Sequence, residues 1–232
     1  MDVITGPGNK YVATAKRLLF GEVGIDFVAG PTDVLIITGG KNSGSGKAVE
    51  FAAADMLAQA EHDPDACARA LVPSKEIAGQ LAAAIAQRLK TLPESNKKIA
   101  SASLEAGGLI IVYQNREEAI KIANQIAPEH LELQVEDSDN WVSSLKNYGS
   151  LFIGAQAAEV LGDYSAGINH TLPTSSGARF TGGLSVRHFL KIATTLRCTG
   201  GEGYKKALNA AQIIGRAEGL EAHAQSALVR IN

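Results

Sequence analysis

Cysteines are scarce in this chain, and so are signs of secretion. Its 232 residues include only two cysteines, Cys67 and Cys198, which lie far apart. Their positions match no metal-binding or redox spacing, which argues against thiol-based chemistry. The N-terminus also lacks the basic-then-apolar layout of a signal peptide. We therefore expect a cytoplasmic protein with reduced thiols.

An excess of either charge is also missing. The chain has 22 basic and 24 acidic residues, a net charge of -2 and only 5% aromatic residues. No stretch combines Lys or Arg with aromatic residues as a nucleic-acid surface would, so we expect no nucleic-acid partner. The longest apolar runs, such as residues 34–37 and 109–112, are far shorter than the roughly 20 residues that span a bilayer. We therefore expect no membrane partner and interpret these runs as buried strands.

Short apolar runs alternate with segments whose apolar residues recur at helical spacing. The pattern predicts strands at residues 34–37, 70–72, 109–112, 131–135 and 150–153, and helices at 49–61, 77–89, 117–126 and around 141–145. Strands that alternate with helices are typical of an α/β layered sheet with flanking helices. With 45% apolar residues, the chain can bury a sizeable core.

The last third of the chain follows a different pattern. Residues 163–183 are rich in Gly, Ser, Thr and Pro and predict a long loop, a kind of segment that is often functional in compact domains. Helical patterns at 186–196 and 204–223 then predict a small α-helical tail. We expect two domains, an α/β domain at 1–183 and the tail at 184–232.

Four of the five histidines lie in short polar clusters with a carboxylate or carboxamide nearby. These clusters are at residues 59–62, 128–130, 163–170 and 218–223. A neutral imidazole can bind zinc or act as a general base near neutral pH. Together the clusters indicate a metal-assisted active site, although any one of them would be weak evidence.

The first two clusters each allow a functional and a structural interpretation. Gln59 and His62 are three residues apart on a predicted helix, so both side chains can meet one ion or ligand. Alternatively they form a solvated helix end, and zinc prefers His, Cys and carboxylates to Gln. Glu129 and His130 follow Pro128, which should end a helix and place an acid–base pair at a pocket. Helix capping or a surface role is the alternative.

The later histidines are also open to two interpretations. Asp163 and His170 bracket a polar part of the long loop, where they could converge on a ligand or serve as turn residues. Glu218 and His223 are five residues apart, about 140° on an ideal helix, so they share no face unless the helix bends or ends between them. On their own they would belong to a solvated tail. His188 has no acidic neighbour and is expected to be structural.

The glycine-rich segment at residues 39–47 has the setting of a phosphate-binding P-loop, because it follows an expected strand and precedes an expected helix. Its spacing does not match. Gly40 and Gly46 are separated by five residues rather than four, and Ala48 has no hydroxyl for magnesium. We interpret residues 39–47 as a flexible surface insert.

Several segments, taken in order, resemble the histidinol dehydrogenase family along nearly the whole chain. They are Gly6-Pro7-Gly8-Asn9, Ile25-Asp26 with Ala29-Gly30-Pro31, and residues 58–62, 127–132, 147–150, 161–164, 169–174 and 218–223. The resemblance implies an incomplete Rossmann-like fold of the aldehyde-dehydrogenase-like superfamily. It also implies oxidation of L-histidinol to L-histidine in two steps, each reducing one NAD.

The resemblance also implies a role for each candidate residue. It implies zinc binding by Gln59, His62, Asp163 and His223, with His223 reaching in from the partner of a homodimer, and acid–base catalysis by Glu129 and His130. Substrate contacts are implied for Thr32, His130, His170 and Glu218 together with the four zinc ligands, and a cofactor contact for Asn9. Thr32 replaces the family's usual Ser but keeps the hydroxyl.

One departure from the family affects the expected function. This chain begins where the family pattern is about half complete, so Asn9 is the one expected NAD contact present. It is therefore expected to be a C-terminal part of the enzyme, with a separate N-terminal half as a further partner. The alternatives are a non-catalytic zinc-binding or assembly module and a related zinc-dependent amino-alcohol dehydrogenase. The second is disfavoured because His170 and Glu218 are intact.

Overall fold

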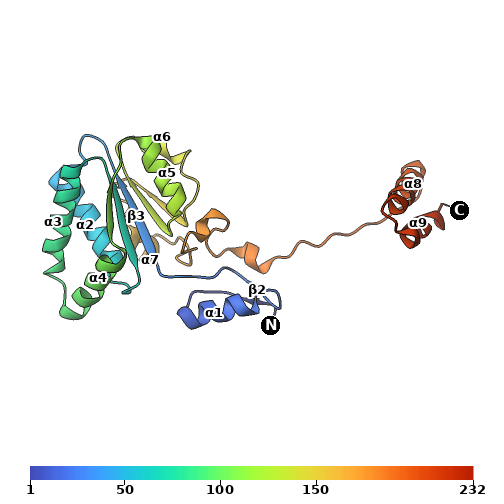
Figure 1. The fold of residues 1–232 in the computed structure, drawn as a ribbon, viewed down its shortest axis with the longest axis horizontal. Coiled ribbons are helices and arrows are strands. Elements are labelled where there is room, and N and C mark those ends of the chain that lie inside the picture. Colours follow the sequence, from blue (N-terminus) through green and yellow to red (C-terminus); the bar gives the residue numbers. More distant parts are fainter. Residues whose placement is uncertain (232) are drawn as a thin grey trace. The chain divides into compact units, whose positions relative to one another are not determined.

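The computed structural model describes residues 1–231, which form two compact units, Met1–Leu190 and residues 191–231. The first unit contains the sheet and its flanking helices (Figure 1). The second contains α8 (Glu202–Ala217) and α9 (Glu221–Leu228). The division follows Leu190, whereas the sequence predicts a boundary after residue 183. No helix in the described part of the chain is both long and apolar enough to cross a membrane.

A parallel sheet of five strands is the centre of the first unit. In spatial order the strands are β5 (Leu109–Val112), β4 (Cys67–Val72), β3 (Asp33–Thr38), β6 (His130–Gln134) and β7 (Ser150–Ile153). The chain enters the sheet at β3, builds outward to β5, and then crosses back to add β6 and β7 on the other side. All five strands are those that the sequence predicts, and the α/β fold class is confirmed.

Helices cover both faces of this sheet, which explains the continuous apolar strands. On one face lie α2 (Gly46–Ala60), α3 (Lys75–Leu89) and α4 (Glu94–Gly107), and on the other lie α5 (Arg116–Ile126) and α6 (Asp139–Val142) (Figure 1). Each face of the sheet has its own apolar core, the first under α2, α3 and α4 and the second under α5 and α6. Side chains of β3 point alternately into these cores, Val34 and Ile36 into the first and Leu35 and Ile37 into the second. A strand buried on both faces shows no polar alternation.

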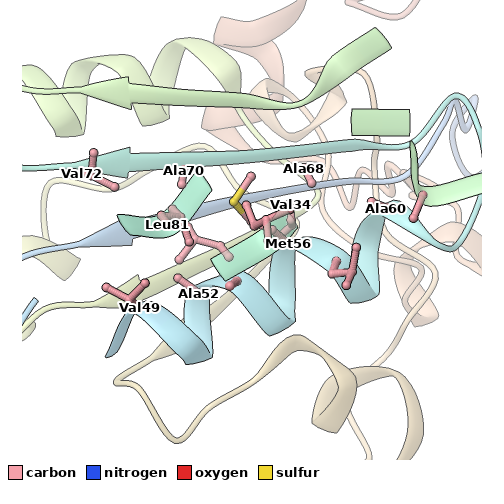
Figure 2. Packing of buried hydrophobic residues seen from close by; sticks show 14 residues of the cluster. Val34, Val49, Ala52, Met56, Ala60, Ala68, Ala70, Val72 and Leu81 are labelled. Carbon is pink, nitrogen blue, oxygen red and sulfur yellow. The ribbon is translucent and has the colours of Figure 1, made fainter. Parts of the chain in front are cut away.

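The first core packs α2 and α3 against the strands. Met56 and Leu81 are each 1% exposed and meet Val34 and Ala70 between the helices and the sheet (Figure 2). Burying a side chain of this size stabilises a fold by about 1.5–3 kcal/mol. Because α2 returns antiparallel to β3, its C-terminal end lies near the start of that strand. This packing therefore fixes where Gln59 and His62 can lie.

The structure differs from the predicted elements in several places. The sequence pattern missed α4, and also a small N-terminal parallel sheet, β1 (Val3–Ile4) with β2 (Gly24–Ile25), and its helix α1 (Lys10–Leu19). The expected loop at 163–183 starts later, because α7 (Glu159–Tyr164) continues into it, and it contains the 3-10 turn η1 (Gly177–Arg179).

The expected helix at 186–196 is wrong, because only the 3-10 turn η2 (Val186–Phe189) forms there. Beyond it, the apolar side chains of Ile192 and Leu196 are 98% and 89% exposed. A short helix is marginal in water without an apolar face to bury, and these residues bury none within the described units. The expected helix at 204–223 is interrupted after α8 at Gly219, whose φ of +77° is accessible to glycine at little cost.

Candidate active site

The candidate site lies at the amino ends of the central strands. Thr32 directly precedes β3, His130 begins β6, and the register of the sheet pairs His130 with Val34. Ligands of open α/β sheets usually bind at the opposite, carboxyl edge. Here the amino edge receives polar side chains because α2 ends beside it and α7 begins beside it. The first backbone N–H of α7, that of Glu159, donates to the Glu132 carboxyl of β6 at 3.1 Å.

A pocket of about 320 Å³ brings most of the predicted residues together. It is lined by Thr32, His62, Glu129, His130, Asp163, Tyr164 and His170. An adjoining pocket of about 300 Å³ shares His62, Asp163 and Tyr164 and also contacts Glu159. Six residues singled out from the sequence therefore face one cavity, although they come from segments far apart in the chain.

Glu129 is held at the pocket by the start of β3. Its Oε2 accepts a hydrogen bond from the Thr32 hydroxyl at 2.5 Å and from the Asp33 backbone N–H at 3.2 Å. In return, the Glu129 N–H donates to Asp33 Oδ1 at 3.2 Å. Burial raises the pKa of Glu129 to about 7, and the charges of Asp33 and Asp163 act in the same direction. A carboxyl with this pKa is suited to general-base catalysis near neutral pH.

Two local features bring Glu129 to this position. The helix α5 ends at Ile126, and the left-handed backbone of its C-cap Ala127 (φ 50°) turns the chain before Pro128. The segment before β7 then runs against this turn, with Gly149 N–H bonded to the Pro128 carbonyl at 3.0 Å and Ser150 N–H to the Glu129 carbonyl at 2.8 Å. A Cβ on Gly149 would lie 2.5 Å from the Glu129 carbonyl oxygen, so the approach requires glycine.

His130 lies between carboxyl groups and is only 3% exposed. Its Nδ1 lies 3.4 Å from Glu159 Oε1 and 4.0 Å from Glu129 Oε2, and its Nε2 lies 3.8 Å from Asp163 Oδ1. Burial lowers the pKa of His130 to about 4, although the charge of Asp163 opposes this. The imidazole is therefore neutral at pH 7 and can accept a proton.

Two buried acids beside His130 escaped the sequence interpretation. Glu132 and Glu159 are 1% and 4% exposed. Burial is the main cause that raises the pKa of Glu132 to about 8 and that of Glu159 to about 9. Two signals could have found them. Glu132 lies two residues after His130 on the same face of its strand, and Glu159 precedes Asp163 by one helical turn.

Three of the four predicted zinc ligands lie in the first unit. His62 and Asp163 line both pockets, and Gln59 is fully buried one turn before His62. Imidazole nitrogen and carboxylate oxygen suit zinc, and a carboxamide oxygen is a weaker third donor. Within residues 1–231, however, no three His, Cys, Asp or Glu side chains lie close enough to hold a metal ion. The donor set fits zinc, provided that a further ligand comes from outside this unit.

The remaining predicted residues lie elsewhere. Asn9 caps α1, where its side chain accepts from the N–H groups of Tyr11 and Val12. It lines a separate pocket of about 590 Å³ that also reaches Thr32. Glu218 and His223 belong to the second unit, where Glu218 caps the C-terminus of α8 and His223 lies in α9, so a break in the helix separates them as their spacing requires if they are to act together. His188 accepts the Ser185 N–H at 3.1 Å, in agreement with a structural role.

The glycine-rich segment lies at the carboxyl edge, away from the site. It connects β3 to α2, which begins at Gly46 with Ser45 as its N-cap. The Glu136 carboxylate accepts the Asn42 N–H at 3.0 Å and packs against Gly40. A carboxylate bonded to the Asn42 N–H opposes the binding of a phosphate at this turn, in line with the failed P-loop spacing.

Comparisons with known proteins identify relatives of this chain. The family model described as histidinol dehydrogenase matches residues 1–231. The histidinol dehydrogenase of Bradyrhizobium diazoefficiens is 46% identical over 230 residues, which are 99% of this chain and 51% of that protein. The crystal structure of histidinol dehydrogenase from Elizabethkingia anophelis matches with a TM-score of 0.87 and 37% identity, over 99% of this chain and 51% of that one.

A more distant likeness concerns the fold alone. An acetylating aldehyde dehydrogenase from Geobacillus thermoglucosidasius matches 87% of this chain and 58% of its own with a TM-score of 0.54 at 12% identity. The chain spans about half the length of the curated relatives that it matches. Since the family model covers the described chain from end to end, the chain belongs to the histidinol dehydrogenase family.

Proposed function

We propose that this chain forms the zinc- and substrate-binding part of a cytoplasmic histidinol dehydrogenase, which oxidises L-histidinol to L-histidine with NAD. The observation that carries the proposal is the meeting of His62, Glu129, His130 and Asp163 at one pocket. A neutral imidazole and a carboxyl with a pKa of about 7 are a suitable pair for two successive proton transfers.

The two bases would act in different steps. In the first oxidation, His130 would accept the substrate's hydroxyl proton at Nε2, the nitrogen that faces Asp163. In the second, Glu129 would take a proton from the water that attacks the aldehyde carbon, while the Thr32 hydroxyl and the Asp33 N–H hold its carboxylate in place. Separate bases allow each step to have its own geometry.

Zinc would be held by Gln59, His62 and Asp163, with the partner subunit's His223 as the fourth ligand of a homodimer. Zinc, when bound, would anchor the imidazole and amine of the substrate, and NAD would accept the hydride. His170 lines the same pocket and would contact the substrate, as would Glu218 from the second unit. Asn9 would contact NAD, with the rest of the cofactor site supplied by a separate N-terminal half.

Metal binding by the purified chain tests this proposal. After dialysis, we expect about one zinc ion per chain, bound through ligand types that zinc prefers. His62→Ala should lose most of this zinc, whereas His188→Ala, which changes a histidine outside the pocket, should keep it. Equal zinc content in His62→Ala and the parent would contradict the ligand assignment.

Turnover gives the second part of the test. The chain alone should oxidise L-histidinol slowly or not at all, because a cofactor binds well only to a largely preformed cleft. Addition of the N-terminal half of a related histidinol dehydrogenase should raise the rate. A zinc-loaded chain that stays inactive in that mixture would instead support the non-catalytic zinc-binding module.

A further inference from the structure

A buried acid, Glu159, contacts two parts of the candidate site at once. It is the first residue of α7, and its backbone N–H is bonded to Glu132 Oε1 of β6 at 3.1 Å. Asp163 follows one turn later on the same helix face. The start of α7 is therefore fixed to the sheet, and this attachment fixes the position of the Glu159 carboxyl.

The first contact is with the side-chain amide of Gln59, which is fully buried. One end of this amide lies 3.0 and 3.2 Å from the two carboxyl oxygens of Glu159, and the other lies 3.1 Å from the Thr32 hydroxyl. The Glu159 carboxyl offers an acceptor oxygen whether or not it is protonated, so the favoured orientation of Gln59 turns the amide nitrogen toward it, where the nitrogen donates. The amide oxygen of Gln59 is consequently turned toward Thr32, which lines the pocket.

The second contact is with His130. Its Nδ1 is buried and has no hydrogen-bond partner in the described part of the chain, and the nearest carboxyl oxygen is that of Glu159 at 3.4 Å. An unpaired buried ring nitrogen is costly, and a small closure would make this contact a hydrogen bond. Such contacts in active sites often shorten when the substrate complex forms.

We infer that Glu159 is a positioning residue of this site, one that turns the oxygen of Gln59 toward the metal position and fixes the ring of His130 through Nδ1. The inference rests on the proposed function, because it assigns Gln59 to zinc and His130 to proton transfer. Groups that hydrogen bond to metal ligands orient them, and their loss typically lowers metal affinity by about 10–100-fold.

Zinc affinity of three variants tests the inference. Glu159→Leu keeps the approximate volume but removes every acceptor, so the Gln59 amide is free to turn its nitrogen to the metal. We expect a loss of about 10–100-fold in zinc affinity, measured by competition with a chelating dye. Glu159→Gln keeps one acceptor oxygen and should recover most of the affinity. Asp55→Asn changes a neighbouring, half-buried carboxyl that makes no hydrogen bond to Gln59 or His130 among the described residues, and it should bind zinc as the parent does.

A role in folding alone would give a different pattern. Removing one partner of a buried hydrogen bond is destabilising, so Glu159→Leu should lower the thermal midpoint of the metal-free form, and the positioning role shows as a loss of zinc affinity measured while the variant is still folded. If Glu159→Leu does not fold, Glu159→Asp takes its place, because it draws the carboxyl back by one methylene and should also weaken zinc binding. Parent-like affinity in the folded variant, or equal losses in the Glu159 and Asp55 variants, would overturn the inference.

A second readout separates this inference from the proposed function. Nitrogen NMR of the metal-free chain reports the state of each histidine ring without requiring zinc or turnover. We expect Glu159→Leu to shift the ring resonances of His130 and to leave those of His188 unchanged. If the parent binds no zinc, the proposed function fails, while this shift still supports the contact with His130. Unchanged His130 resonances in Glu159→Leu would overturn the positioning role.

Discussion

At the scale of single residues, the buried carboxyl of Glu132 links the pH of the solution to the stability of the fold. Burial raises its pKa from 4.5 to about 8, so the folded chain keeps a proton that the unfolded chain has lost above about pH 5. The stabilising effect of this proton is fully present below pH 4.5 and is lost as the pH rises through 8. Alkaline conditions should therefore destabilise the metal-free chain.

Glu132→Gln should remove much of this dependence, because the amide does not ionise. Each unit of pKa shift corresponds to about 1.4 kcal/mol, so the free energy of unfolding of the parent should fall by a few kcal/mol more than that of the variant between pH 5 and 9. Urea denaturation at several pH values measures the difference. The exposed Glu105→Gln is the control and should follow the parent. Identical pH profiles for parent and Glu132→Gln would show that the carboxyl does not titrate as described.

Residue types and their spacing predicted much of the pocket, but not its buried acids. The polar clusters around His62, His130 and Asp163 identified side chains that the fold brings to one cavity. The position of Glu132 beside His130 did not show that it is buried, because a strand that alternates Leu with polar residues normally has one solvated face. Only the tertiary structure, in which the start of α7 bonds to Glu132 and Asp55 of α2 lies beside it, shows that this face is covered.

At the scale of elements, the packing of α3 on α2 and the sheet is expected to contribute strongly to stability. Leu81 is 1% exposed in the first core (Figure 2). Leu81→Ala should lower the free energy of unfolding by about 2–5 kcal/mol, through lost burial and the cavity that remains. Leu18→Ala in α1, where the side chain is 77% exposed, should change it by less than about 0.5 kcal/mol. Chemical denaturation compares the two, and similar losses would contradict the core assignment.

Strongly periodic elements were predictable, and elements without an apolar face were not. Buried strands such as β3 and amphipathic helices such as α3 carry their pattern in the sequence. The helix α4 was missed because small residues, Ala and Ser, make its contact with the sheet, and they give a weak periodic signal. The helix predicted at 186–196 has the opposite explanation. Its residues show a helical apolar pattern, but within the described units they have no apolar surface to pack against.

At the scale of the whole molecule, the proposed homodimer predicts complementation between two defective chains. Neither His62→Ala nor His223→Ala should bind zinc well by itself. A mixed dimer would contain one site with both changes and one with neither, so about half of its sites should recover zinc under two-fold symmetry. The measurement is zinc content after the two variants are dissociated, mixed and reassembled. Mixed dimers without recovered zinc would mean that His223 does not complete a partner's site.

The position of the pocket at the amino edge has a practical consequence for labelling the protein. The six residues of β3 separate this edge from the turn before α2 by about 20 Å, at roughly 3.3 Å per residue. A fluorophore or affinity tag placed in that turn, for example at the exposed Lys41, would lie at the far end of the strand from Thr32 and Glu129. The β3–α2 turn is thus a suitable attachment point for following assembly without disturbing the chemistry.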